Sequence, residues 1–106
     1  MNAAEIFAGM PQAFRADKAG DLRATFQFNL SGEGGGNWAV KVADGACTVV
    51  QGQADKPNVT IGMLAGDYVR MTGGELQPVV AFMQGKIKLQ GDMNLAMRLQ
   101  ELFGIG

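Results

Sequence analysis

Three consecutive segments of alternating apolar and polar residues constrain the fold of this chain most strongly. Residues 25–30 alternate in this way, and residues 38–42 do so again after a glycine-rich turn. A period of two is typical of β-strands, because successive side chains point to opposite faces of a sheet. Asp44-Gly45 is typical of a tight turn, so a third strand is expected at 46–50. The short connections predict an antiparallel meander of three strands.

Helices and two more strands are expected on either side of the meander. The expected helices cover residues 2–14, 67–71, 78–83 and 93–103, and the expected strands cover residues 59–63 and 86–90. Asn2 and Glu5 have the spacing of a reciprocal helix cap. Pro11 is expected to kink or split the first helix, and Asp92 is the expected N-cap of the last one. Helices that bracket a largely antiparallel sheet indicate an α+β domain of two layers.

The composition argues against several classes of function. The chain has 106 residues and a net charge of −1, so a basic surplus that could neutralise phosphates is missing and nucleic-acid binding is not expected. The sequence contains no histidine and a single cysteine, Cys47. Nucleophile pairs that need histidine are therefore excluded, and a transition-metal site of a familiar type is not expected. We expect a protein that is not an enzyme and that has no cofactor.

The location of the protein is predicted from the same features. A lone cysteine cannot form an internal disulfide and fits a reducing cytosol. The first residues carry Glu5 and no basic cluster before an apolar run, so a secretory signal is not expected. The longest purely apolar run covers residues 79–83 and is far shorter than the roughly 20 residues of a membrane span. We expect a cytoplasmic protein.

Several patterns have two interpretations. The glycine-rich segment 32–36 could cradle a phosphate, but the strand pattern that follows it favours a hairpin loop. Cys47 is favoured as a small core residue over a thiolate nucleophile. Lys86 and Lys88 have two interpretations. They could contact an anionic head group or a membrane surface, but the favoured interpretation is that they prevent an exposed sheet edge from pairing with another chain. The seven methionines suit either an apolar pocket or ordinary core packing.

One long motif resembles a known family. Residues 81–96 have the sequence AFMQGKIKLQGDMNLA, which follows a Thr-Gly turn and a helix that begins with Pro78. This run is similar to the C-terminal half of the sterol carrier protein type 2 domain, also called the nonspecific lipid-transfer family. The front half fits the same family at Gly35-Gly36-Asn37-Trp38, at Asp44-Gly45 and at residues 57–61. The resemblance covers about the whole chain, as one sterol-carrier-type domain over residues 1–106.

The resemblance implies both a fold and a function. It implies a five-stranded, mostly antiparallel sheet covered on one face by helices, with a hydrophobic tunnel between sheet and helices. The family binds fatty acids, fatty acyl-CoA, phospholipids and sterols with low selectivity and has no catalytic residues of its own. We expect neither the peroxisomal tail of the animal proteins nor a fused thiolase or dehydrogenase. These departures indicate a compact prokaryotic-type member, whose ligand is expected to be a fatty acid, fatty acyl-CoA, phospholipid or isoprenoid-like lipid in preference to a sterol.

The expected function is therefore binding and carriage or transfer of lipids. The alternative is a non-catalytic accessory that presents a lipid-like intermediate to a partner enzyme, and a weak thioesterase is the least favoured class. We expect a monomer or weak dimer that makes transient contact with membrane surfaces. The residues expected to contact the ligand are Met71, Leu76, Val79, Phe82, Met83, Leu95, Leu99, Leu102 and Phe103, with Gln84 as a polar contact at the mouth.

Overall fold

A five-stranded sheet forms the base of the structure, which is a computed structural model describing residues 2–103. The strand order is β3-β2-β1-β4-β5, and neighbouring strands are antiparallel except for β1 and β4, which run parallel. The expected α+β class with a mostly antiparallel sheet is confirmed. The strands are β1 (Ala24–Ser31), β2 (Gly36–Ala43), β3 (Ala46–Gln51), β4 (Val59–Leu64) and β5 (Lys88–Gly91).

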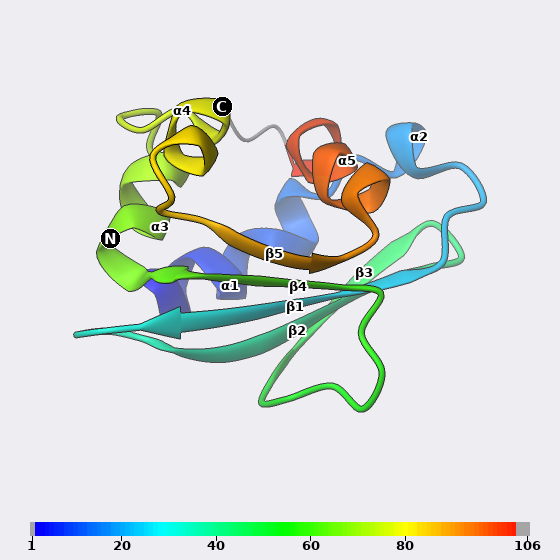
Figure 1. The fold of residues 1–106 in the computed structure, drawn as a ribbon. Helices are drawn as coiled ribbons and strands as arrows, with labels where there is room; N and C mark the ends of the chain where they lie inside the picture. The colour runs from blue at the N-terminus through cyan, green and yellow to red at the C-terminus, as the bar shows by residue number, and fades with distance from the viewer. Residues whose placement is uncertain (1, 104–106) are drawn as a thin grey trace.

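The helices lie on one face of this sheet (Figure 1). They are α1 (Ala3–Ala13), α2 (Ala16–Ala19), α3 (Ala65–Thr72), α4 (Pro78–Met83) and α5 (Met93–Phe103). Helices α4 and α5 sit above the β4–β5 side of the sheet, and α1 passes behind them (Figure 1). The two layers are therefore sheet and helices, as the sequence pattern predicts.

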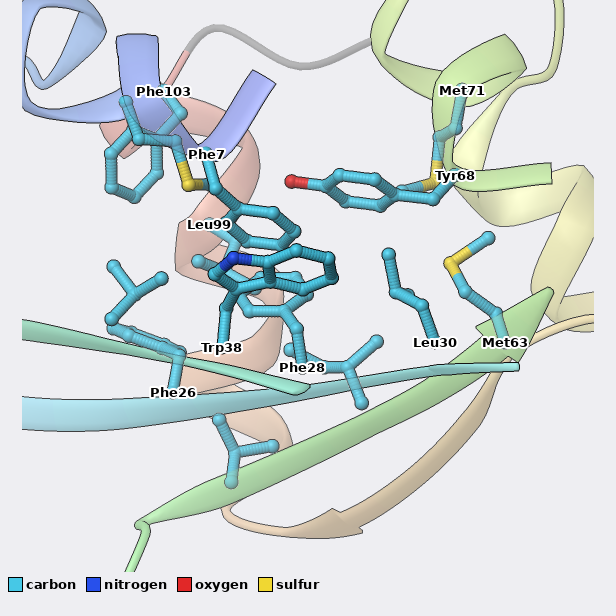
Figure 2. Close-up of a cluster of buried hydrophobic side chains, with 14 of the residues drawn as sticks. Phe7, Phe26, Phe28, Leu30, Trp38, Met63, Tyr68, Met71, Leu99 and Phe103 are labelled. Atoms are coloured by element: carbon cyan, nitrogen blue, oxygen red, sulfur yellow. The ribbon is translucent and has the colours of Figure 1, made fainter. Parts of the chain in front are cut away.

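The alternation in β1 decides which side chains enter the core. Phe26, Phe28 and Leu30 face the helices and are buried. From α1, Phe7 is stacked against Trp38, with ring centroids 4.5 Å apart, and against Tyr68 of α3, at 5.1 Å. Phe7 also meets Phe28 edge to face at 5.2 Å. Figure 2 shows this aromatic cluster, which holds α1 and α3 against the middle of the sheet.

The other face of β1 carries one fully buried polar side chain, Gln27. Its amide nitrogen donates to the Gly52 carbonyl oxygen at 3.0 Å, and its amide oxygen accepts from the Ala54 backbone N–H at 2.8 Å. These bonds pin the loop between β3 and β4 against the sheet. Burial of the amide is favourable because its donor and acceptor both have partners.

The first helix begins as predicted but is not split. The Asn2 side chain accepts from the Glu5 backbone N–H, and the Glu5 side chain accepts from the Asn2 backbone N–H, which completes the capping box. Pro11 lies inside α1, and the helix continues to Ala13. A proline in the last turn removes a single intrahelical bond, so the helix does not separate into two pieces there.

The strand expected at 86–90 begins two residues later than predicted. Gly85, with φ 75°, ends the α4 segment, and the Lys86 backbone N–H donates to the Ala81 carbonyl oxygen at 2.9 Å. This bond, together with one from the Gly85 N–H to Phe82, is a Schellman motif that holds Lys86 in the helix end. Strand β5 therefore starts at Lys88, at the edge of the sheet, where a lysine discourages pairing with another chain.

We predict that Gly91→Ala lowers the free energy of unfolding by about 1–3 kcal/mol or more. Gly91 has φ 106°, and a Cβ there would lie 2.3 Å from the Asn58 carbonyl oxygen. Gly66→Ala in α3 is the control, because a Cβ there meets nothing within 4 Å. The control is expected to raise stability by about 0.5–1 kcal/mol. Urea denaturation measures both, and equal stabilities would contradict the prediction.

Candidate functional site

An apolar cavity of about 280 Å³ lies between the β4–β5 side of the sheet, α4 and α5. Twelve of its thirteen lining residues are apolar, and Gln100 is the single polar one. None of the lining residues carries a titratable side chain. The cavity is lined by Phe28, Ile61, Met71, Pro78, Val79, Phe82, Ile87, Leu89, Met93, Ala96, Met97, Leu99 and Gln100.

The floor of the cavity is a row of side chains on neighbouring strands. Phe28 of β1 is the register partner of Ile61 on the parallel strand β4, and Ile61 is the register partner of Leu89 on β5. Partners in register project their side chains from the same face of a sheet. Because all three line the cavity, the row faces the helices. The parallel β1–β4 pairing thus brings residues far apart in the sequence into one apolar floor.

The roof comes from α5 and from α4. On α5, Ala96 lies three residues after Met93, and Leu99 and Gln100 lie three and four residues after Ala96, so the four residues share one face of the helix. Ala96 is half-buried and contributes only a methyl group, which leaves space above the floor. Met97, which is 73% exposed, stands at the rim. The cavity therefore opens to solvent beside α5.

The expected ligand-contact residues fall into distinct groups. Four of them line the cavity: Met71, Val79, Phe82 and Leu99. Leu76 and Leu102 are buried in the core, and Leu95 is half-buried against it. Met83 and Gln84 are exposed and lie outside the cavity lining, and Phe103 lines a different groove beside α1. Contact of any of these residues with a ligand stays a prediction.

The sequence pattern did not identify the floor of the cavity or four of the five α5 residues that line it. Phe28, Ile61, Ile87 and Leu89 were recognised as strand residues and not as cavity residues. Their alternation predicts that they face inward, but only the strand order shows that they face the same space as α5. Met93 and Met97 are four residues apart on α5, and this spacing predicts that they lie on the same face of the helix.

The structure also places the groups that could ligate a metal or act as a nucleophile. In residues 2–103, no cluster of three or more histidine, cysteine or acidic side chains could hold a metal ion. Burial raises the pKa of the Cys47 thiol to about 11, so the thiol is neutral at physiological pH. Cys47 also packs partly against the core, which agrees with the favoured interpretation of a small core residue.

The exposed apolar surface gathers around the cavity. Eight large hydrophobic side chains are exposed in the part of the chain that the structure describes, of which four lie on α4 and two on α5. Val79, Phe82, Met93 and Met97 belong to both this surface and the cavity lining, while Val80 and Met83 extend it. Contiguous exposed apolar patches often mark interaction sites. Over the same residues, 2–103, the helices are too short or too polar to span a membrane.

Comparison with known families and sequences gives consistent matches. The SCP-2 sterol transfer family matches residues 5–104. Hydroxysteroid dehydrogenase-like protein 2 of Xenopus tropicalis is 35% identical over 101 residues, which are 94% of this chain and 24% of that protein. The same protein of Mus musculus is 40% identical over 81 residues, 76% of this chain. The chain thus spans about a quarter or less of the length of these curated relatives.

Solved structures show the same fold. Palmitated Sterol Carrier Protein 2 Like 2 of Aedes aegypti superposes with a TM-score of 0.80 at 28% identity, over 97% of this chain and 95% of that one. The sec-alkylsulfatase Pisa1 of Pseudomonas sp. has a segment with a TM-score of 0.80, which covers 99% of this chain and 16% of that one. The identity to the sulfatase is 23%, so this second likeness concerns the fold alone.

We predict that Cys47 is alkylated slowly at pH 8. With the pKa raised from 9.0 to about 11, the thiolate fraction below pH 9 is about one hundredth of that of an unperturbed thiol. The rate with iodoacetamide should rise about tenfold per pH unit until the pH approaches 11. Mass spectrometry of the intact protein measures the rate, with glutathione as the control. A rate equal to that of glutathione at pH 8 would show that the thiol is not shielded.

Proposed function

Because the chain belongs to the SCP-2 sterol transfer family, we propose that it binds lipids in the cavity under α4 and α5 and carries or transfers them with low selectivity. The observation that carries this proposal is the cavity lining, in which twelve of thirteen residues are apolar. Membership of the family supports lipid binding and transfer in general. The apolar lining supports a ligand held mainly by burial, which is non-directional and so tolerates many chains.

The magnitude of the burial energy is sufficient for useful affinity. Each buried methylene contributes about 0.8 kcal/mol, so a sixteen-carbon chain could supply on the order of 12 kcal/mol before costs. Association and ordering consume several kcal/mol of this. A dissociation constant of roughly micromolar or below follows without a specific polar contact. The proposed ligands are fatty acids, fatty acyl-CoA, phospholipids and isoprenoid-like lipids.

The cavity must widen to take a whole long chain. Its volume of about 280 Å³ lies at the lower end of ligand pockets, which span roughly 300–1,000 Å³. The rim residues Met93, Met97 and Phe82 are exposed, so they can move without breaking core packing. Methionine side chains are flexible enough to follow ligands of different shape. The palmitated form of the Aedes aegypti relative is consistent with an acyl ligand on this fold.

The proposed contacts combine the expected wall with the floor that the structure adds. The acyl chain of the ligand is contacted from the helix side by Met71, Val79, Phe82 and Leu99. It is contacted from the sheet side by the row of Phe28, Ile61 and Leu89. Leu76, Leu95, Leu102 and Phe103 support the wall from the core side. Gln100, which lines the cavity, takes the polar role at the mouth that was expected for Gln84. No catalytic step and no cofactor are part of this proposal, which places the protein in the cytoplasm.

A second candidate is an accessory role, in which the domain presents a lipid-like intermediate to a partner enzyme. The observation in its favour is that the matched region makes up only 24% of Hydroxysteroid dehydrogenase-like protein 2. In such proteins this domain sits beside other sequence. The two roles differ in one measurement. A carrier moves fluorescent lipid between vesicles when it is added alone, whereas an accessory requires its partner and is recovered with it in a stable complex.

We predict that Ala96→Trp weakens binding of a fluorescent fatty acid at least about tenfold, because the indole fills the space above the floor and displaces several methylenes. Asn94→Trp is the matched control, since Asn94 is exposed on the same helix and lies outside the cavity lining. Fluorescence titration measures the affinity, and circular dichroism confirms that both variants fold. Unchanged affinity in folded Ala96→Trp would refute the proposed site.

We also predict that Val80→Gln combined with Met83→Gln slows transfer of lipid between vesicles several-fold while the equilibrium affinity stays the same. Both side chains are exposed beside the cavity but do not line it, so they are available for transient contact with a membrane surface.

The control for this pair is Leu64→Gln. Leu64 is an exposed apolar residue at the end of β4, directly before α3, and it also lies outside the cavity lining. The control should transfer lipid at the rate of the unmodified protein. An equal loss in the control, or a loss of affinity in the double variant, would contradict a role for α4 in membrane contact.

A further inference from the structure

A second groove, with a volume of about 590 Å³, lies between α1 and α3. Ile6, Gly9, Met10 and Ala13 form its α1 side, and Phe103 of α5 also lines it. It shares no lining residue with the cavity under α4 and α5. Helix α3 separates the two spaces, because Tyr68 and Thr72 face the groove whereas Met71 faces the cavity. Its volume lies within the usual range of small-molecule sites.

Tyr68, which lines the groove, carries a buried hydrogen-bond donor that has no partner among residues 2–103. The Tyr68 side chain is fully buried, and its hydroxyl has no hydrogen-bond partner in the part of the chain described, residues 2–103. Figure 2 shows the hydroxyl pointing from α3 toward the side where Phe103 lies, away from Met63. Buried polar groups nearly always have a partner, and one without a partner costs stability. Burial also raises the pKa of Tyr68, so the hydroxyl keeps its proton and can donate.

The charges at the rim disfavour an anionic ligand. Glu5, Arg70 and Glu75 line the groove, and Arg70 already lies 3.5 Å from the Asp67 carboxylate and 3.9 Å from that of Glu75. The single cation is therefore shared among acidic neighbours, and no positive charge is left over for a carboxylate or phosphate. An uncharged group avoids both the repulsion and the cost of burying a charge.

We infer that this groove is a second binding site, for an uncharged amphiphile whose single carbonyl or hydroxyl oxygen accepts a hydrogen bond from Tyr68. The apolar part of the ligand lies along Ile6, Met10 and Phe103, which belong to the apolar part of the lining. Ketones, esters and alcohols with a hydrocarbon tail have this chemistry. The site goes beyond the proposed carrier function, because its selectivity for an uncharged head group does not depend on the cavity under α4 and α5.

The test uses decan-2-one as the uncharged probe and decanoate as the anionic probe of similar length. Tyr68 is the single tyrosine of the chain, so its ring resonances report on the groove directly in NMR titrations. Decan-2-one is expected to shift these resonances and to give intermolecular nuclear Overhauser effects (NOEs) to the tyrosine ring. Decanoate is expected to bind there at least about tenfold more weakly, because its charge must be buried beside acidic groups.

The variant Tyr68→Phe tests the contribution of the hydroxyl, because it removes this group and keeps the aromatic ring. Loss of one hydrogen bond should weaken decan-2-one binding at the groove about five- to tenfold, which the shifts of α1 and α3 amides measure in this variant. The variant should fold and should be at least as stable as the unmodified protein, since it removes a buried donor that lacks a partner. Unchanged affinity in Tyr68→Phe would overturn the role of the hydroxyl.

Gly9→Trp fills the groove and should abolish binding of decan-2-one there. A Cβ at Gly9 meets nothing within 4 Å, so a side chain can be attached there without a clash at its first atom. Gly66→Trp in α3 is the matched control, because a Cβ there is equally free and Gly66 does not line the groove. The control should bind normally. If decan-2-one binds Gly9→Trp as well as it binds the control, the groove is not a site.

A further variant separates this inference from the carrier proposal. Ala96→Trp, which blocks the cavity under α4 and α5, should leave the NOEs between decan-2-one and Tyr68 intact. If Ala96→Trp abolishes all binding of decan-2-one, the second site is wrong and the carrier proposal stands. If fatty-acid binding survives in Ala96→Trp while the groove variants behave as expected, the carrier cavity is wrong and the second site stands.

Discussion

The stacking of Phe7 against Trp38 and Tyr68 determines which part of the space between sheet and helices is filled by side chains. Centroid distances of 4.5 and 5.1 Å join α1, β2 and α3 into one aromatic cluster above the middle of the sheet (Figure 2). Such pairs contribute about 0.5–1.5 kcal/mol each beyond the burial of their area. The aromatic side chains of Phe7, Trp38 and Tyr68 are thereby gathered in one place in the core. The β4–β5 side is left to α4 and α5, whose contribution to packing is smaller.

The hollow on that side has a simple cause. Helix α4 has six residues, and four of its side chains are exposed, so it covers little of the sheet. Helix α5 places Ala96 above the row formed by Phe28, Ile61 and Leu89. A solid core would require a larger side chain at that position. The same sparse packing that leaves room for a lipid also makes the α4–α5 region the part best able to move, since few buried contacts hold it.

Much of the fold follows from local sequence, because local rules determine each element. The alternation in residues 25–30 and 38–42, the Asn2–Glu5 cap and Pro78 at the first turn of α4 predict elements that the structure contains. The Schellman motif that delays β5 depends on the positive φ of Gly85, and residue type alone does not show whether a glycine adopts it.

The candidate site was harder to predict. The parallel β1–β4 pairing places Ile61 beside Phe28, and no short-range pattern encodes a contact between residues so distant in the chain. Helical periodicity identified Leu99 and Leu102 as one stripe, but not that Leu99 meets the cavity while Leu102 is buried in the core.

The account rests on the claim that an acyl chain enters the space between the sheet and α5. Isotope-filtered NMR of the protein with uniformly ¹³C-labelled palmitate tests this claim most directly. The account predicts intermolecular NOEs from the acyl chain to the side chains of Ile61, Leu89 and Met97, and none to Trp38 in the aromatic cluster. Palmitate that binds with NOEs confined to Trp38 and its neighbours, or that does not bind at all, would contradict it.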